Sequence, residues 1–227
     1  MTRAILLSAG RGERMRPLSD TVPKALIPIK NKPLIVHHLE KLAAAGITDV
    51  VINVSHLADK IREALGDGKK FNLNIMYSYE AEMLETGGGI LKALPLLGDE
   101  PFLVISSDIY TDFDYEALLM DSRGEARLAR LKNKAILAYL ILVPNPDYHP
   151  EGDFSLDSNG FLTNKPQYTY SNIGLYHPDF FIGCTPGRFP LGPLIRKAID
   201  QGRVIGDLYR GLWYNAGTME ELKKIEE

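Results

Sequence analysis

The sequence predicts one α/β domain with a mixed, mainly parallel central sheet and helices on both of its faces. Through the first half of the chain, apolar runs of strand length alternate with stretches of helical periodicity, which is the pattern of successive βα units. The chain has 227 residues, of which 45% are hydrophobic and 24% charged, enough for a large core without disulfides or a structural metal. No linker, repeat or low-complexity tract interrupts it, so residues 1–227 are expected to form a single domain.

The elements of the first half are predicted from periodicity and from helix-ending residues. Four segments are rich in β-branched or apolar residues, or alternate them with polar ones, and are expected to be strands: 3–8, 50–54, 73–78 and 102–106. Three helices are expected between them: one that begins at Pro33 and ends at Gly46, one that ends at Leu65, and one from a glycine turn at 87–89 to about Leu97.

From about residue 135 the pattern becomes rich in strands, and these are expected to extend the same sheet in antiparallel or mixed orientation. The segments with this character are 135–143, 154–162, 168–176 and 212–214. Residues 157–160, Asp-Ser-Asn-Gly, predict a turn inside the second segment. Residues 218–221, Thr-Met-Glu-Glu, match a capping box and predict a short surface helix at the C-terminal end.

Charge and composition exclude several classes of protein. The net charge is −3 and no block of Lys or Arg stands out, so the sequence has no electrostatic footprint for nucleic acid. The single cysteine, Cys184, fits a reducing compartment, and no apolar run is long enough for a signal peptide or a membrane span. We therefore expect a cytoplasmic protein without membrane or nucleic-acid partners. The five histidines show no metal-binding spacing, and no Gly-x-Ser-x-Gly motif supports a hydrolase.

A glycine-rich turn follows the first predicted strand. Gly10 and Gly12 would let backbone N–H groups approach a phosphate closely, and Arg14 and Lys24 could converge on a triphosphate. Met15 stands where a dinucleotide fingerprint needs a small residue, and the Gly-Lys-Ser/Thr of a Walker A loop is missing. From spacing alone, a solvent-exposed basic loop is about as good an interpretation as a phosphate site.

Two longer motifs make the prediction specific. Leu-x-x-Ala-Gly-x-Gly-x-Arg-Met-x-Pro-Leu at 6–18 and Pro-Lys-x-Leu-x-Pro at 23–28 resemble the sugar-phosphate nucleotidylyltransferases, which couple a sugar 1-phosphate to a nucleoside triphosphate and release pyrophosphate. Residues 84–89, 94–98 and 187–213 are most similar to the N-acetylmuramate 1-phosphate uridylyltransferases of bacterial cell-wall recycling. The resemblance implies a Rossmann-like sheet of the nucleotide-diphospho-sugar transferase type.

The resemblance also implies a role for each matching residue. Implied nucleotide contacts are Ala9, Gly10, Gly12, Arg14, Lys24, Glu80 and Gly88. Implied sugar-phosphate contacts are Glu85, Asn164, Lys165 and Asn172. The expected catalytic residues are Arg14, which would bind the leaving pyrophosphate, Lys24, which would stabilise charge at the α-phosphate, and Asp108. The glycines at 87–89 are expected to leave room for a substituent on the sugar.

A magnesium ion is implied at Asp108, for which Mn²⁺ could substitute. Asp108 follows the predicted strand 102–106 and should lie at its carboxyl end, where open α/β sheets bind ligands. Asn215 stands where the family has a second carboxylate ligand, and it keeps an oxygen donor but loses a charge. Two smaller departures are Ser107, where the family usually has glycine, and Asn164, where it has glutamate.

The reaction expected from the resemblance is an in-line attack of the sugar 1-phosphate on the α-phosphorus, without a protein nucleophile. UTP with N-acetylmuramic acid 1-phosphate is the favoured substrate pair. GTP with mannose 1-phosphate, and dTTP or UTP with glucose 1-phosphate, are alternatives of the same class. A nucleotide-sugar-binding regulatory domain without turnover is an alternative of another class, motivated by Ser107 and Asn215 and opposed by the presence of all the expected phosphate-binding residues.

Overall fold

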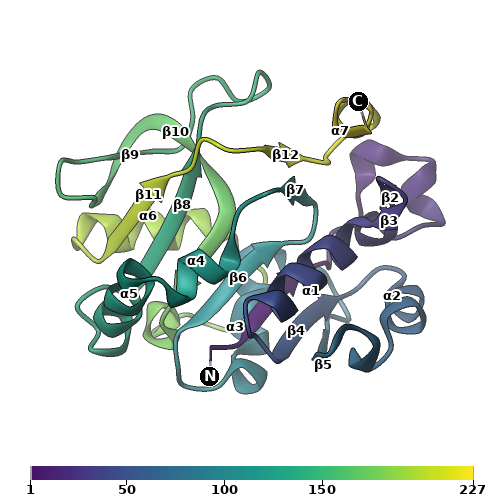
Figure 1. Cartoon of the computed structure of the whole chain (residues 1–227), viewed down its shortest axis with the longest axis horizontal. Coiled ribbons are helices and arrows are strands. Elements are labelled where there is room, and N and C mark those ends of the chain that lie inside the picture. Colours follow the sequence, from purple (N-terminus) through teal and green to yellow (C-terminus); the bar gives the residue numbers. More distant parts are fainter. Residues whose placement is uncertain (1, 227) are drawn as a thin grey trace.

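A mixed central sheet organises the molecule (Figure 1). The computed structural model describes residues 2–226, and within them the sheet has the order β11-β8-β10-β6-β1-β4-β5, with β9 paired to β10. Its strands are β1 (Ala4–Leu7), β4 (Asp49–Val54), β5 (Asn74–Tyr79), β6 (Phe102–Ser106), β8 (Ala138–Val143), β9 (Phe154–Leu156), β10 (Leu162–Tyr176) and β11 (Val204–Leu208). The pairs among β1, β4, β5 and β6 and the pair β8–β11 are parallel, whereas β10 runs antiparallel to its neighbours. The predicted fold class is confirmed.

Helices cover both faces of this sheet, and their apolar residues form two separate cores. The helices are α1 (Leu34–Ala44), α2 (Ala58–Leu65), α3 (Glu85–Leu97), α4 (Tyr115–Met120), α5 (Ser122–Lys132), α6 (Gly192–Asp200) and α7 (Met219–Glu226). Because side chains alternate along a strand, Leu6 of β1 packs with α1, α2, α4 and α5, whereas Ile5 packs with α3 and α6. One-turn 3₁₀ helices span Glu13–Met15, Leu18–Asp20, Lys24–Leu26, Lys69–Phe71 and Pro178–Phe181.

A third, smaller core joins the two ends of the chain. It contains Met15 and Ile29 from the N-terminal region and Leu222 and Ile225 from α7. Figure 1 shows α7 beside the hairpin of β2 (Pro28–Ile29) and β3 (Lys32–Pro33). The expected cap of α7 is present, because the Thr218 hydroxyl accepts a hydrogen bond from the Glu221 N–H at 3.3 Å.

The C-terminal strand differs from the prediction. β12 (Trp213–Asn215) does not extend the central sheet but pairs antiparallel with β7 (Ile109–Thr111) in a separate two-stranded sheet. This pairing brings Asn215 opposite Ile109, the residue that follows Asp108. We predicted no element for the segments that form α4, α5, α6 and β11.

The glycines at 87–89 are not a turn, and they do not leave room for a ligand. They lie in the first turn of α3, whose N–H groups at Gly87 and Gly88 donate to the Phe189 carbonyl at 3.0 and 3.1 Å. A Cβ on Gly87 would lie 2.5 Å from the Phe189 ring, and one on Gly88 would lie 2.1 Å from the Gly187 carbonyl oxygen. The space that we assigned to a sugar substituent is therefore filled by the protein's own 187–189 segment.

Replacing Gly88 by Ala tests this packing. Alanine normally stabilises a helix relative to glycine by about 1 kcal/mol, but here its Cβ would overlap backbone that cannot rotate away. We expect Gly88→Ala to lower the free energy of unfolding by about 1–3 kcal/mol in urea titrations followed by circular dichroism. Gly192→Ala is the matched control, since a Cβ at Gly192 of α6 meets nothing within 4 Å. Equal stability of the two variants would contradict the contact.

Candidate active site

A cavity of about 370 Å³ lies where β1 and β6 end at the carboxyl edge of the sheet. Its walls are the glycine-rich turn after β1, the start of α3 and the residues after β6. It brings together four residues that the sequence analysis assigned to substrate, Ala9, Gly10, Lys24 and Glu85, and the expected catalytic residue and metal ligand Asp108. Residues far apart in the sequence thus meet at one edge, as expected for a ligand site of an open α/β sheet.

A short ion pair in this cavity joins Lys24 and Asp108. The Lys24 Nζ lies 2.5 Å from Oδ2 of Asp108, and the Ser106 hydroxyl donates to Oδ1 at 2.6 Å. Burial raises the pKa of the Asp108 carboxyl, but the Lys24 ammonium and the Ser106 hydroxyl outweigh burial and hold that pKa below its usual value. Asp108 is therefore an anion at neutral pH, with a cation already beside it.

A second cavity, of about 330 Å³, adjoins the first. The two share Leu7 and Thr86 in their walls, and the second contains Asn172 and Asn215 of the predicted site residues. Other polar residues that line it are Tyr148, His149, Asp153, Thr169, Tyr170 and Arg196. Two adjoining cavities can hold two substrates side by side.

Gly12 and Arg14 lie beside these cavities without lining them. Gly12 has a φ of 64°, which glycine adopts readily, and a Cβ there would lie 3.5 Å from the Lys24 Cβ. Arg14 is exposed, and its Nη2 lies 2.9 Å from the position that a Cβ on Gly217 would take. The Asn215 Oδ1 lies 3.2 Å from that same position, so Arg14 and Asn215 approach Gly217 together.

Besides Gly12 and Arg14, four further predicted contacts lie outside the walls of both cavities: Glu80, Gly88, Asn164 and Lys165. Gly88 is buried against Gly187, as described above. Asn164 donates to the Asp200 carboxylate at 2.7 Å, and Lys165 is exposed within a stretch of β10 where the register with β9 shifts. Asn164 and Lys165 thus lie apart from the cavities, whereas Gly88 and Glu80 lie close to Glu85 at the start of α3 without lining a cavity.

Glu80 belongs instead to a buried polar bridge that the sequence analysis missed. Its Oε1 accepts from the Asn53 Nδ2 at 2.7 Å, and its Oε2 accepts from the Leu84 N–H at 3.0 Å. The Asn53 Oδ1 in turn accepts from the Ser8 N–H at 2.7 Å. The bridge ties the glycine-rich turn to the segment that opens α3. The available signal was a single amide side chain within the β-branched run 50–54.

His38 is a second residue that the sequence analysis missed. Its ring lies on the buried face of α1, with Nε2 2.7 Å from the Ile109 carbonyl oxygen and Nδ1 2.9 Å from the Tyr115 hydroxyl. A neutral ring that donates from Nε2 and accepts at Nδ1 satisfies both partners. His38 thereby fixes β7 next to Asp108, which makes it a positioning residue. Burial, as the largest cause, lowers the pKa of His38 to about 4.

Asp108 and Asn215 fit a divalent cation. The Asn215 Oδ1 is buried without a hydrogen-bond partner, and the next residue, Ala216, donates its N–H to the Asp108 carbonyl at 2.8 Å. One carboxylate and one amide oxygen are hard donors of the kind that Mg²⁺ accepts alongside phosphates and water. Residues 2–226 contain no cluster of three or more His, Cys, Asp or Glu that could hold a metal by itself. Substrate phosphates would have to complete the shell.

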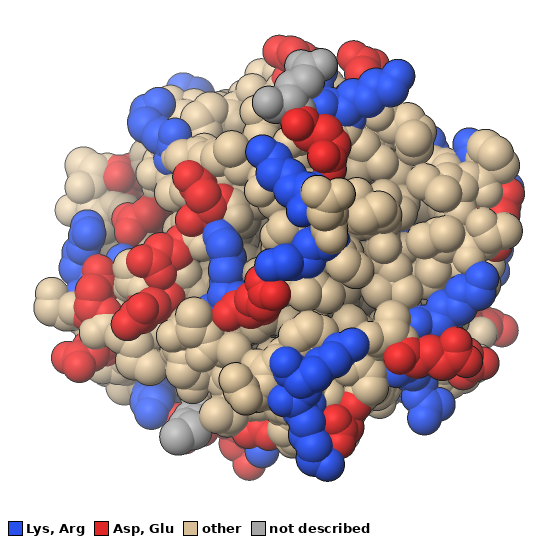
Figure 2. Space-filling view, turned by 45° about the vertical axis from the view of Figure 1, so that its right-hand side comes forward, with Lys and Arg blue, Asp and Glu red and all other residues tan. Residues whose placement is uncertain are grey.

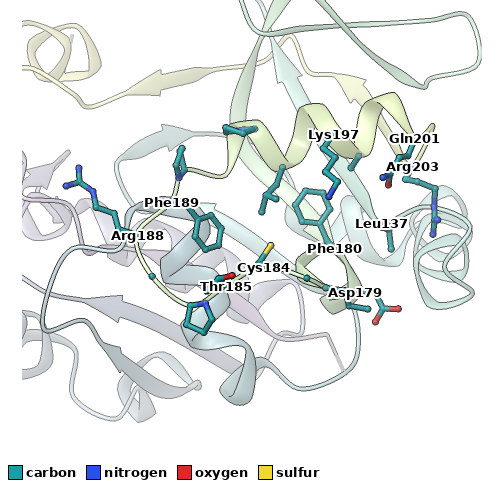
Figure 3. Close-up of a pocket in the computed structure, with 18 residues that line it drawn as sticks. Leu137, Asp179, Phe180, Cys184, Thr185, Arg188, Phe189, Lys197, Gln201 and Arg203 are labelled. Atoms are coloured by element: carbon teal, nitrogen blue, oxygen red, sulfur yellow. The ribbon is translucent and has the colours of Figure 1, made fainter.

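A larger cavity, of about 850 Å³, lies elsewhere, between α6 and the segment 182–190 (Figure 3). It contains none of the predicted site residues. Lys197 of α6 points into it beside Phe180 (Figure 3). The surface in Figure 2 interleaves Lys and Arg with Asp and Glu without an extended basic patch, in keeping with the net charge of −3.

Comparisons with known proteins agree with this site. Residues 3–140 match the family described as nucleotidyl transferase. An N-acetylmuramate α-1-phosphate uridylyltransferase from Neisseria meningitidis is 44% identical over 99% of this chain and 96% of its own length. A mannose-1-phosphate guanyltransferase from Hypocrea jecorina is 41% identical over 65% of this chain, but only 42% of that protein is covered. The solved UDP-glucose pyrophosphorylase with UDP-glucose has a TM-score of 0.76 at 19% identity and covers 100% of this chain and 97% of its own, which shows a common fold.

The chain belongs to the nucleotidyl transferase family, and within it to the sugar 1-phosphate nucleotidylyltransferases. The family predicted from the motifs at 6–18 and 23–28 is confirmed. No helix within residues 2–226 is long and apolar enough to cross a membrane.

The buried His38 predicts a pH dependence of stability. Its folded pKa of about 4 lies below the ordinary 6.5, so the unfolded chain takes up the proton first as the pH falls. The free energy of unfolding should therefore decrease between pH 6.5 and pH 4, with up to about 3 kcal/mol due to this group. His38→Gln should flatten that slope in denaturant titrations at several pH values. His37→Gln, at the neighbouring position of α1, is the matched control for loss of an imidazole ring. An unchanged slope in His38→Gln would show that the pKa of His38 is the same in the folded and the unfolded chain.

Proposed function

We propose that this protein transfers a uridylyl group from UTP to N-acetylmuramic acid 1-phosphate and releases pyrophosphate. The observation that carries the reaction class is the pair of adjoining cavities, with Lys24 and Asp108 in one and Asn215 in the other. The choice of UTP and N-acetylmuramic acid 1-phosphate is supported by the relative from Neisseria meningitidis, which matches along almost its whole length. The product, a UDP-linked N-acetylmuramic acid, is consistent with a role in peptidoglycan recycling in the cytoplasm. The single free cysteine is consistent with that reducing compartment.

In the proposed mechanism, UTP occupies the first cavity with its phosphates against the glycine-rich turn, and the sugar phosphate occupies the second. The phosphate oxygen that attacks the α-phosphorus is already ionised at neutral pH, so no protein base is needed. Lys24 stabilises the charge that develops on the α-phosphate, and the exposed Arg14 binds the departing pyrophosphate. Catalysis then comes from holding two phosphates in line and offsetting their charge.

Asp108 and Asn215 hold the divalent cation in this proposal, Mg²⁺ or in its place Mn²⁺. When bound, the cation neutralises phosphate charge. Lys24 lies 2.5 Å from the Asp108 carboxylate, so this half-buried charge has a cationic partner within the protein. Because Asn215 contributes no charge, the protein alone holds the cation weakly, and nucleotide phosphates provide the remaining ligands.

Other members of the same class remain alternatives. Mannose-1-phosphate guanylyl transfer is favoured by the Hypocrea jecorina relative, although less than half of that protein is covered. Glucose-1-phosphate thymidylyl or uridylyl transfer is supported by a Streptomyces griseus relative that is 29% identical. A nucleotide-sugar-binding domain without turnover rests on the neutral Asn215, and the intact Lys24–Asp108 pair opposes it.

A pyrophosphate-release assay with a matrix of nucleoside triphosphates and sugar 1-phosphates tests the proposal. We expect UTP with N-acetylmuramic acid 1-phosphate to give the highest kcat/KM. N-acetylglucosamine 1-phosphate is the matched comparison, since it lacks only the lactyl group. Equal or better kcat/KM with that substrate would overturn the choice of sugar but not the reaction class. Nucleotide binding without turnover of any pair would favour the non-catalytic alternative.

The neutral ligand at 215 predicts an unusual metal requirement. Asn215→Asp should lower the Mg²⁺ concentration needed for half-maximal rate, whereas Asp108→Asn should nearly abolish metal-dependent activity because no carboxylate ligand remains. Titration of Mn²⁺ followed by electron paramagnetic resonance should show the same order of affinity. Asn172→Asp places an equal charge in the same cavity and should leave the metal requirement unchanged. An unchanged requirement in Asn215→Asp would place this residue outside the coordination shell.

A further inference from the structure

The second cavity contains one permanent cation whose partner the protein does not supply. Arg196 lines this cavity together with one carboxylate, Asp153. Both Asp153 oxygens are engaged, Oδ1 with the His149 Nε2 at 3.2 Å and Oδ2 with the Tyr170 N–H at 2.8 Å. Arg196 forms no ion pair with any acidic side chain of residues 2–226, and its hydrogen bond, from Nη1 to the Asp153 carbonyl, is long at 3.4 Å. Most of its five N–H donors are thus available to a ligand.

The guanidinium of Arg196 is nevertheless held in place. It lies over the ring of Phe154, 4.9 Å from the ring centroid, and Phe154 is a buried residue of β9 that also lines the cavity. Such a cation–π contact fixes the plane of the guanidinium without using its N–H groups. Gly192 and Ile195 of α6 line the cavity beside it, so Arg196 belongs to the helix face that forms this wall. A fixed fork of unused donors is suited to an anion with two oxygens.

Arg196 lies away from the reacting phosphates. It lines only the second cavity, which meets the first at Leu7 of β1 and at Thr86. α6 packs against β10, and β10 is separated from β1 by β6, so β10 and β1 lie about 10 Å apart at ordinary strand spacing. A sugar 1-phosphate must present its phosphate at the end near Asp108 in order to react. The anion that reaches Arg196 must then be another group on the sugar.

We propose that Arg196 determines sugar specificity by binding a carboxylate of the sugar substrate, the lactyl carboxylate that N-acetylmuramic acid carries on C3. This inference rests on the proposed function and deepens it, since it names the residue that distinguishes this acid from a neutral sugar 1-phosphate. The lactyl arm extends from the ring and ends in two oxygens, which match the bidentate geometry of a guanidinium. A neutral sugar would leave Arg196 unpaired and would gain nothing from it.

The test compares kcat/KM for N-acetylmuramic acid 1-phosphate and N-acetylglucosamine 1-phosphate in two Arg196 variants and a control. Arg196→Gln should lower kcat/KM for the muramic acid substrate by about 10- to 100-fold and change that for the glucosamine substrate little. Arg196→Lys keeps the charge and the aliphatic stem but not the bidentate fork, so it should fall between wild type and Arg196→Gln. Lys197→Gln is the matched control, because Lys197 is the next residue of α6 and points into the other cavity (Figure 3).

The outcomes separate the inference from the proposed function. An equal loss for both substrates in Arg196→Gln would mean that Arg196 binds the shared phosphate or supports the fold, and would overturn the inference. Wild-type protein without a preference for the muramic acid substrate would instead overturn the proposed sugar, whatever Arg196 does. Thermal unfolding of each variant shows whether the variant is folded. If Arg196→Gln is not folded, the comparison of kcat/KM for the two substrates in Arg196→Lys tests the inference alone.

Discussion

A buried polar bridge is the constraint on which the site depends. Asn53 and Glu80 are 3% and 1% exposed, and a carboxylate so far from water is tolerated only where fixed donors surround it. Asn53 and the Leu84 N–H supply these donors, and the same Asn53 side chain accepts from the Ser8 N–H. The turn after β1 is thereby kept at a set distance from the start of α3, and the width of the first cavity follows from that distance. Gly89 completes the arrangement, because a Cβ there would lie 2.6 Å from the Glu80 Oε1.

Three cationic side chains lie in or beside the two cavities although the overall charge of the protein is −3. Lys24 lies in one cavity, Arg196 in the adjoining one, and Arg14 beside Asn215. Lys24 is paired with Asp108, whereas Arg196 lies over the ring of Phe154. Asn215 adds a buried amide oxygen without a hydrogen-bond partner to this region, and it adds no negative charge.

Local patterns predicted the strands and placed Asp108 at the edge where the glycine-rich turn also lies, whereas Lys24 was assigned to that edge through the motif at 23–28. Asp108 could be assigned because the carboxyl ends of neighbouring parallel strands meet at one edge. The packing partners of Gly87 and Gly88 could not be predicted, because Phe189 and Gly187 are about a hundred residues away in the chain. Local periodicity carries no information about such distant contacts. Asn164 and Lys165 lie where β10 shifts register, which alternation cannot reveal. His38 was visible as a histidine on an otherwise apolar helix face, but its partners at Ile109 and Tyr115 were not.

The small core that unites Met15 and Ile29 with Leu222 and Ile225 has a consequence for synthesis on the ribosome. The segment 12–29 emerges early, yet the apolar surface that supports it is completed only when α7 has emerged. Until then the glycine-rich turn can form its hydrogen bond to Asn53, but Met15 lacks the apolar side chains of α7 against which it packs. The pairing of β12 with β7, which places Asn215 opposite Ile109, is also still missing. A nascent chain can therefore hold a nearly complete central sheet before α7 supports the segment around Met15 and before β12 pairs with β7.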